Sequence, residues 1–307
     1  MRHPFFLVSA LCLGGLAACS ATDKNLYQDD TGDSPTSSGA GGDGDGGAGG
    51  ASVGNAAGGT SAGSFSTGMS SSSSGAGGNL VAEVYGHSPS VLYKLDPLTK
   101  QVSVVGPFQG CSSIIDIAID QNHEIYGAAS GGLYRIDKVT AACSLIKAGS
   151  YPNSLSFVPV GALDPAIEVL VGYQGSNYIR IDTITGDIMS VGTLGGGLSS
   201  SGDIVSVKDG GTYLTVNGSG CNDCIVEVNP TTGALVKNYG GVGHNAVFGL
   251  AYWGGSAYGF SNAGKLFEIF FMGNAVTTQL INVPSVPGGL QFWGAGSSTI
   301  APVNPPK

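Results

Sequence analysis

Two aspartates occupy the same position in two copies of an internal repeat. Asp116 and Asp203 each precede a strand tyrosine, Tyr126 or Tyr213, by ten residues. Carboxylates at matching positions on strands that face one channel could hold a cation or accept a hydrogen bond from a sugar hydroxyl. They could equally accept backbone N–H groups of the adjoining turns, which would give them a structural role. The residues alone leave both interpretations open.

Three more polar residues lie in segments that should lead into the inner strands of the same repeat. These are Asn153, His244 and Asn245. Where repeated sheets surround a channel, the loops that enter the innermost strands gather at one mouth of that channel. We therefore expect Asp116, Asn153, Asp203, His244 and Asn245 to line a ligand-binding mouth.

Motifs for catalysis are missing from the sequence. His87, His123 and His244 show no metal-ligand spacing. The chain has no nucleophile elbow and no glycine motif that would bind phosphate at the start of a helix. Residues 120–124 carry oxygen-bearing side chains as a calcium loop does, but they lie between two strands of a hairpin, where a turn is expected. We therefore assign no catalytic residue, no metal and no cofactor.

The elements that must position these residues follow from the repeat. A strand pattern of the type Leu-Tyr-Lys-Leu-Asp returns five times, at residues 92–96, 133–137, 178–182, 225–229 and 266–270. Successive copies are 41 to 47 residues apart, and a repeat of this length that is built from strands is typical of a β-propeller. No segment after residue 80 has a sustained 3.6-residue apolar period, so we expect an all-β domain.

The two ends of the repeat array complement each other. The first copy has only three strands, at residues 81–85, 91–95 and 102–105, and residues 289–293 supply the apolar pattern of a fourth. Pairing of the two ends would complete a blade and remove an open sheet edge. The sequence therefore predicts five blades of four antiparallel strands, closed by the N- and C-terminal strands. A six-bladed alternative would need a further unit that we do not find in the sequence.

The N-terminal residues predict export and a lipid anchor. Residues 1–18 combine a basic start with an apolar run that is too short to span a bilayer, as in a signal peptide. Residues 16–19, Leu-Ala-Ala-Cys, resemble the lipobox of bacterial lipoproteins. The resemblance implies cleavage before Cys19 and diacylation of its thiol, and Ser20 in place of Asp implies sorting to the outer membrane. The alternative is an ordinary secretory signal with a chance cysteine.

A tether separates the anchor from the folded domain. Residues 19–78 are dominated by Gly, Ser, Ala and Asp, and such a composition buries too little apolar surface to fold. We expect this segment to be a disordered linker with a net charge of about −5. The β-propeller domain should span residues 79–307, with 15 acidic and 10 basic side chains.

The repeat also carries a resemblance to a known class. The recurring Leu-Tyr-x-Ile-Asp-x-x-Thr-Gly strand and turn resembles that of quinoprotein-like and YVTN-type bacterial propellers. A lipobox, a Gly/Ser tether and such a propeller together resemble bacterial lipoproteins without an assigned activity. The resemblance covers residues 80–300 and implies architecture, not an active site.

The cysteines fit an oxidising compartment. Four remain in the propeller domain, Cys111, Cys143, Cys221 and Cys224, and an even number outside the cytoplasm favours disulfides. Cys221 and Cys224 should bridge in the loop before a strand, although a redox pair has the same spacing. Cys111 precedes an innermost strand and Cys143 begins an outermost one, so the sequence leaves their pairing open.

Charge and composition restrict the function. The domain is acidic and has no basic stripe, which argues against nucleic acid and against direct binding to anionic lipid. We expect a monomeric, non-catalytic binding or scaffold module at the bacterial outer membrane, with a glycan or a protein as ligand. The alternative is a metal-dependent hydrolase or lactonase at the channel, which would use Asp116, Asp203 and Asn153. The residues alone do not identify the ligand, the membrane face or the oligomeric state.

Overall fold

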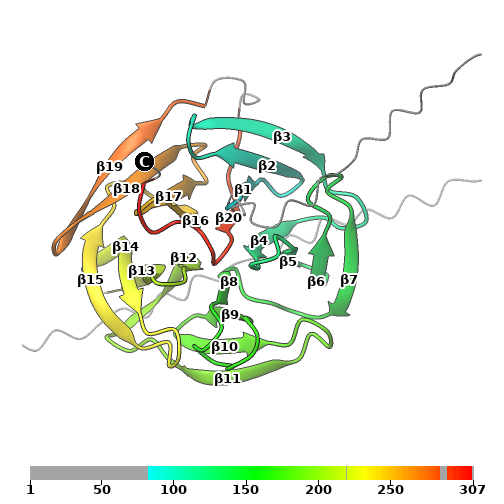
Figure 1. Ribbon diagram of the computed structural model, residues 1–307, viewed down its shortest axis with the longest axis horizontal. Helices are drawn as coiled ribbons and strands as arrows, with labels where there is room; N and C mark the ends of the chain where they lie inside the picture. Colours follow the sequence, from blue (N-terminus) through cyan, green and yellow to red (C-terminus); the bar gives the residue numbers. More distant parts are fainter. Residues whose placement is uncertain (1–81, 219, 284–288, 306–307) are drawn as a thin grey trace, which may run out of the picture. The chain divides into compact units, whose positions relative to one another are not determined.

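The chain folds into a ring of sheets. The computed structural model describes residues 82–218, 220–283 and 289–305. These residues form five four-stranded antiparallel sheets around an axis, without helices, which is a five-bladed β-propeller (Figure 1). The predicted all-β class and five blades are confirmed, and the six-bladed alternative is wrong. The signal peptide, Cys19 and the tether lie outside the described residues.

Each blade runs from an inner strand at the axis to an outer strand at the rim. The first blade contains β20 (Gly294–Ser297), β1 (Val84–His87), β2 (Val91–Asp96) and β3 (Gln101–Pro107). The second contains β4 (Ile114–Ile119), β5 (Ile125–Ala129), β6 (Gly132–Ile136) and β7 (Cys143–Ala148). The third contains β8 (Leu155–Val158), β9 (Val169–Gln174), β10 (Asn177–Ile181) and β11 (Ile188–Thr193). The fourth contains β12 (Leu198–Ser206), β13 (Thr212–Gly218), β14 (Cys221–Val228) and β15 (Leu235–Gly241). The fifth contains β16 (Val247–Trp253), β17 (Ser256–Ser261), β18 (Leu266–Met272) and β19 (Ala275–Ile281).

The chain ends close the ring as predicted, but with a different C-terminal strand. β20 pairs antiparallel with β1, from Val84 opposite Ser297 to His87 opposite Gly294. The closing strand therefore follows residues 289–293 and does not include them. The axis is crowded, and a Cβ on Gly294 would lie 2.4 Å from His87 Nε2. Only small residues fit this strand, so residues 294–297 lack the apolar pattern that led us to predict the closing strand at residues 289–293.

The recurrent Asp or Asn stabilises the turn between the third and fourth strands of four blades. Its side-chain oxygen accepts hydrogen bonds from the backbone N–H groups two and three residues later. The capping residues are Asp96, Asp137, Asp182 and Asn229. This Asx turn explains why an acid or amide ends the repeated strand pattern.

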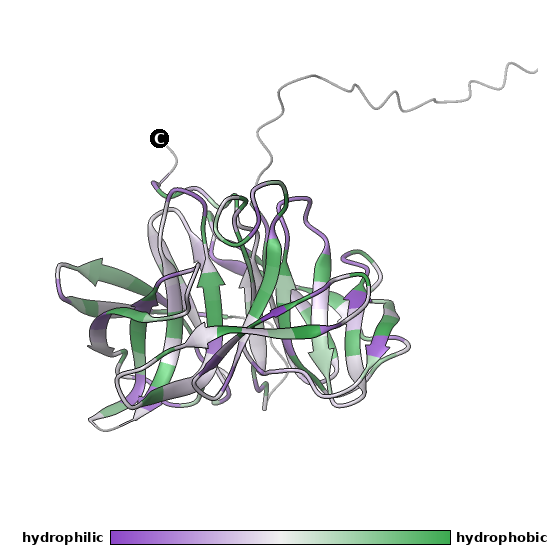
Figure 2. Cartoon of the chain, turned by 90° about the horizontal axis from the view of Figure 1, so that it is seen from below, coloured by the Kyte–Doolittle hydropathy of each residue, from purple (hydrophilic) through white to green (hydrophobic). Residues whose placement is uncertain are grey.

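Apolar residues fill the spaces between the sheets. Figure 2 shows hydrophobic stretches within the strands and more hydrophilic residues in the loops at their ends. Tyr173 and Tyr178 are fully buried, and both donate to the next blade, Tyr173 to the Gly233 carbonyl at 2.6 Å and Tyr178 to the Pro230 carbonyl at 2.8 Å. The polar end of each ring is thus paired while its body seals the contact between blades.

The linker between β3 and β4 brings two distant cysteines together. It passes the start of the outer strand β7, where the Cys143 N–H donates to the Gln109 carbonyl at 2.7 Å. Cys111 then lies with its Cα 5.7 Å from that of Cys143, and the two form a disulfide. The pairing that the sequence left open is therefore present, because the chain enters the second blade past its rim.

Candidate functional site

The two faces of the propeller differ. One face of the ring carries the loops that lead into the inner strands β4, β8, β12, β16 and β20, and we call it the entry face. On the opposite face, residues 298–305 cross the turns of the fourth and fifth blades. The Lys208 N–H donates to the Thr299 carbonyl at 2.8 Å, and the Gly254 N–H donates to the Pro302 carbonyl at 2.7 Å. The C-terminal segment thus covers these turns, and the entry face is where a ligand can approach the axis.

The two predicted aspartates lie at the axis, fully buried. They belong to inner strands of the second and fourth blades, which are separated by the third blade. Asp116 Oδ2 accepts from the Leu155 N–H of the third blade at 2.6 Å. Asp203 Oδ2 accepts from the Leu250 N–H of the fifth blade at 2.7 Å. These carboxyls therefore tie inner strands together across blades, which is the structural role that the sequence left open.

The two carboxyls also interact with each other. Burial raises the pKa of Asp116 well above its usual range, and the nearby negative Asp203 raises it further. Burial raises the pKa of Asp203 too, although hydrogen bonds from Asp116 and from three backbone N–H groups oppose the rise. Because two buried carboxylates repel each other, the pair favours the protonated form of Asp116.

His87 is the third buried polar group at this level. Its Nδ1 lies 2.9 Å from the Ser88 carbonyl oxygen and must donate, so Nε2 carries the lone pair. His87 Nε2 and Asp116 Oδ1 have no hydrogen-bond partner among the described residues, and each lies 2.4 Å from the position of a Cβ built on Gly294. Burial lowers the pKa of His87 to about 4, against a smaller opposing effect of the Ser88 carbonyl. The imidazole is therefore neutral at pH 7.

A cavity of about 290 Å³ opens on the entry face, and we call it the mouth pocket. It is lined by three apolar side chains and three amides, namely Ile115, Phe248, Trp293, Asn153, Asn262 and Gln291. The lining residues come from the starts of inner strands in the second and fifth blades, from the segments that precede β8 and β20, and from the hairpin between β17 and β18. No Asp or Glu is among them.

Unpaired polar atoms lie at or beside this pocket. The indole Nε1 of Trp293 is buried and has no hydrogen-bond partner among the described residues, and neither has Ser154 Oγ. Trp293 lines the pocket, and Ser154 follows the lining residue Asn153 in the chain. Buried donors without partners cost free energy in the folded protein.

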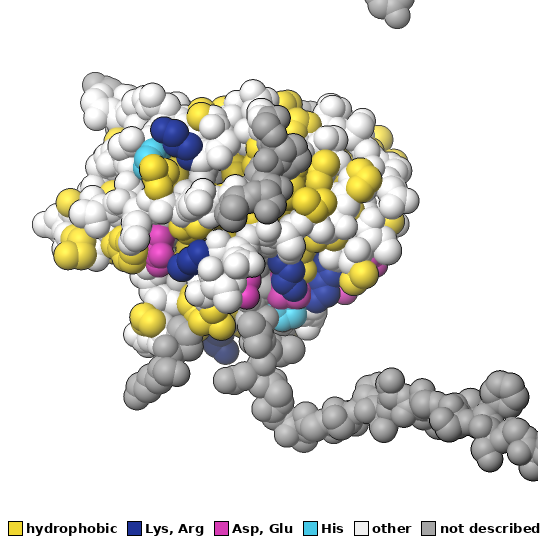
Figure 3. Space-filling view, turned by 90° about the horizontal axis from the view of Figure 1, so that it is seen from above, with side chains coloured by type: hydrophobic (Ala, Val, Ile, Leu, Met, Phe, Trp, Pro, Cys, Tyr) yellow, Lys and Arg dark blue, Asp and Glu magenta, His cyan; other side chains and the backbone are white. Residues whose placement is uncertain are grey.

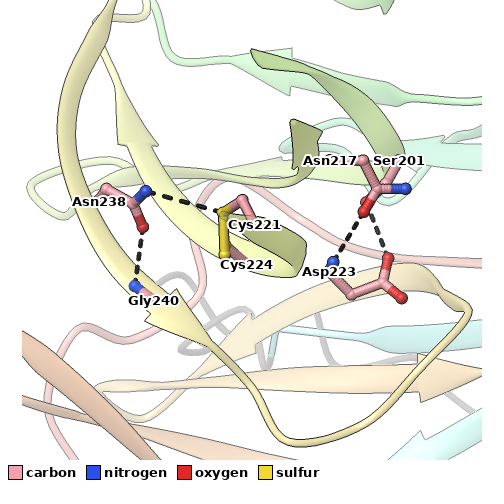
Figure 4. The surroundings of a disulfide bond; sticks show 7 residues. All are labelled: Ser201, Asn217, Cys221, Asp223, Cys224, Asn238 and Gly240. Carbon is pink, nitrogen blue, oxygen red and sulfur yellow. Dashed lines mark hydrogen bonds between the residues drawn. A yellow bond between two sulfur atoms is a disulfide. The ribbon is translucent and has the colours of Figure 1, made fainter. Parts of the chain in front are cut away.

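A disulfide shapes the rim of the entry face. Cys221 and Cys224 are bonded and both lie within β14, whereas the sequence placed them in the loop before the strand. The pairing between β13 and β14 shifts register here, so residues 222–223 form a bulge. The bulge aims Asp223 toward the fourth blade's inner strand, where Ser201 Oγ donates to it at 2.9 Å (Figure 4). Its other oxygen accepts from the Ala246 N–H at 2.7 Å.

The five predicted mouth residues divide into three groups. Asn153 lines the mouth pocket, and His244 with Asn245 lines a smaller hollow beside it. Asp116 and Asp203 lie deeper and are inaccessible. The pocket residues Phe248, Trp293, Asn262 and Gln291 were not predicted from the sequence. Trp293 lay inside the segment assigned to the closing strand, and its aromatic type was the signal that could have found it.

The carboxyls do not assemble a metal centre. Within the described residues, no group of three or more His, Cys, Asp or Glu side chains is arranged to hold a metal ion. Asn153 faces the open pocket while both aspartates are sealed at the axis, so the three residues do not share one cavity.

In the part of the chain that the structure describes, no helix has the length and apolar character needed to cross a membrane.

Comparisons with known proteins assign neither a family nor a function. No protein-family model and no curated protein matches the chain. Similar solved structures include a nidogen–laminin complex, with 10% identity, a TM-score of 0.43 and coverage of 70% of this chain and 78% of that one. A protein of unknown function from Bacteroides caccae has 13% identity, a TM-score of 0.37 and coverage of 69% and 77%. Another from Bacteroides thetaiotaomicron has 15% identity, a TM-score of 0.40 and coverage of 61% and 55%.

Proposed function

We propose that this propeller is a non-catalytic carbohydrate-binding module held at the bacterial outer membrane by a lipid on Cys19. The mouth pocket is the observation that carries the proposal. It combines two aromatic side chains, Phe248 and Trp293, with the amides of Asn153, Asn262 and Gln291. The pocket faces solvent on the entry face and uses residues from several blades.

This set of side chains matches the chemistry of a sugar. A pyranose ring has apolar C–H faces, which pack on aromatic rings, and a rim of hydroxyls that both donate and accept. Amide side chains also donate and accept, so three of them can pair with neighbouring hydroxyls in either direction.

The size of the pocket indicates how much of a glycan it binds. Pockets for small molecules range upward from about 300 Å³, and this one has about 290 Å³. It is therefore large enough for one sugar residue and too small for a folded partner to insert deeply. We infer that the pocket holds a single residue of a longer chain, which continues over the entry face.

The hydrolase alternative has less support. A metal-dependent hydrolase or lactonase needs side chains that hold the ion beside the substrate, and the mouth pocket has no carboxylate or imidazole among its lining residues. Asp116 and Asp203 are 0% exposed and accept backbone N–H groups. Their hydrogen bonds hold the inner strands together, so they are committed to the fold.

The experiment uses the only two tryptophans of the chain. Trp293 lines the pocket, whereas Trp253 ends the inner strand β16 at the opposite face. In the Trp253→Phe variant, Trp293 is the only fluorophore of its kind, so binding of a glycan identified on an array should change its emission. Trp293→Phe should weaken binding by about 10-fold through loss of stacking area.

Two results would count against the function. Either no arrayed glycan binds the folded protein, or Trp293→Phe binds as tightly as the unsubstituted chain. Circular dichroism of both Phe variants would show that the propeller remains folded, so that a loss of binding reports on the pocket.

A further inference from the structure

A second hollow adjoins the mouth pocket. It has a volume of about 190 Å³ and is lined by residues 243–245 and by Ser261, Ala263 and Lys265. The hairpin between β17 and β18 separates the two cavities, because Asn262 lines the mouth pocket while its neighbours in the chain line the hollow. Adjacent Cα atoms are about 3.8 Å apart, so a ligand in one cavity lies close to the other.

The hollow has a basic character in an otherwise acidic domain. No Asp or Glu lines either cavity. Some basic side chains of the domain are neutralised, as when Lys94 and Lys138 bind Glu83 at 2.6 and 2.7 Å near His123. Lys265 forms no ion pair with any described residue. Two histidines are visible in Figure 3: one has basic side chains beside it, and the other has both acidic and basic side chains nearby.

His244 completes the hollow as a neutral partner. Its ring packs against Phe267 with centroids 4.0 Å apart, and its Nε2 lies 3.3 Å from Thr278 Oγ1. Burial lowers the pKa of His244, and the positive charge of Lys265 lowers it further. Lys265 therefore supplies the charge of the hollow at neutral pH, and the imidazole can only add a hydrogen bond.

We propose that the mouth selects acidic oligosaccharides. One sugar ring occupies the mouth pocket, and the carboxylate of a neighbouring uronic acid residue enters the hollow and pairs with the Lys265 ammonium. Because the domain is acidic, most of its surface would repel an acidic sugar. The Lys265 ammonium therefore also sets the orientation in which the oligosaccharide binds. This inference rests on the proposed function and specifies the class of glycan.

The test compares a uronic acid trisaccharide with its carboxyl-reduced, neutral counterpart. Both are titrated against the Trp253→Phe protein, with Trp293 fluorescence as the readout. The acidic form should bind more tightly, and the preference should shrink at high salt because the ion pair is screened. Lys265→Met should weaken binding of the acidic form about 3- to 10-fold and leave the neutral form unchanged. Lys208→Met is the matched control, because Lys208 also lacks an ion pair with a described residue but lies on the opposite face.

The outcomes separate the two proposals. Equal binding of the acidic and neutral forms, or an unaltered affinity in Lys265→Met, would overturn the acidic class and leave carbohydrate binding intact. The same conclusion would follow if neither trisaccharide bound while neutral glycans on the array did. Absence of binding to every glycan would overturn the proposed function itself.

Discussion

The buried carboxyls show how single residues hold this ring closed. Asp203 accepts the N–H groups of Ile204 and Leu250 at 2.6 and 2.7 Å, and Asp116 accepts that of Leu155 at 2.6 Å. Burial raises the pKa of both carboxyls, and the negative charge of Asp203 raises that of Asp116 further. More of the hydrogen bonds around Asp203 favour its charged form, so Asp116 is the carboxyl that more readily keeps a proton.

Asp116→Asn should stabilise the protein at high pH. Because the pKa of Asp116 is raised above its ordinary value of 3.8, the folded state holds more protons than the unfolded chain. The free energy of unfolding therefore falls as pH rises above that value. The amide cannot ionise, so urea unfolding at pH 8 should show a gain of about 1–2 kcal/mol over the unsubstituted protein, shrinking toward pH 4.

Asp203→Asn is the matched control at the same depth. It replaces a carboxylate that accepts several backbone N–H groups with an amide that has one acceptor oxygen. Because burial raises the pKa of Asp203 as well, this variant should also gain relative stability as pH rises, but the lost backbone hydrogen bonds should make its gain smaller than that of Asp116→Asn. A larger gain for Asp203→Asn, or a pH-independent effect of Asp116→Asn, would contradict this account.

At the scale of the elements, the turn after the third strand has one strained position. The residue four places after each capping Asp or Asn has a positive φ. It is Gly186 or Gly233 in two blades but Lys100 or Ala141 in two others. A side chain with a Cβ is disfavoured in this region by about 1–2 kcal/mol. The repeat thus has a preference for glycine that two copies do not follow.

Exchanging the residues at this position should change stability in opposite directions. Ala141→Gly relieves a φ of 56° and should raise the free energy of unfolding by up to about 1 kcal/mol. Gly233→Ala should lower it by more than that, because the new Cβ would lie 2.3 Å from the Tyr178 side chain. Denaturant unfolding of both variants measures the difference, and a loss of stability in Ala141→Gly would refute the turn argument.

At the scale of the whole molecule, the described chain begins away from the entry face. Glu83, just before β1, binds Lys138 in the turn between β6 and β7 and Lys94 in β2. That turn lies on the face opposite the mouth pocket, because β6 runs away from the entry face.

The anchor makes a prediction for the full chain. Cys19→Ala should abolish incorporation of a fatty-acid analogue and move the protein from the membrane fraction to the soluble fraction, because two acyl chains provide the stable attachment. Cys111→Ala, which removes a disulfide cysteine of the domain, is the control and should retain the label. Label that persists in Cys19→Ala would refute the lipobox interpretation.

Much of the architecture was predictable because each repeat contains its own local signals. The 41- to 47-residue period, the alternating strands and the capping Asp or Asn depend on neighbours in the chain, and they gave five blades. Residues 294–297 were missed because their requirement for small side chains comes from His87 and Asp116, which are distant in sequence. The Cys111–Cys143 bridge was undecided for the same reason, since it depends on the path of a linker.

The sequence by itself determined a five-bladed ring closed by its two ends, because strand periodicity and turn chemistry are local properties of the chain. Only the tertiary structure decided that Asp116 and Asp203 meet at the axis and that Phe248 and Trp293 share a pocket with Asn153. The physical reason is that burial and proximity arise when blades curve around an axis. Residues far apart in the chain then face the same small volume, and no local pattern records which of them do.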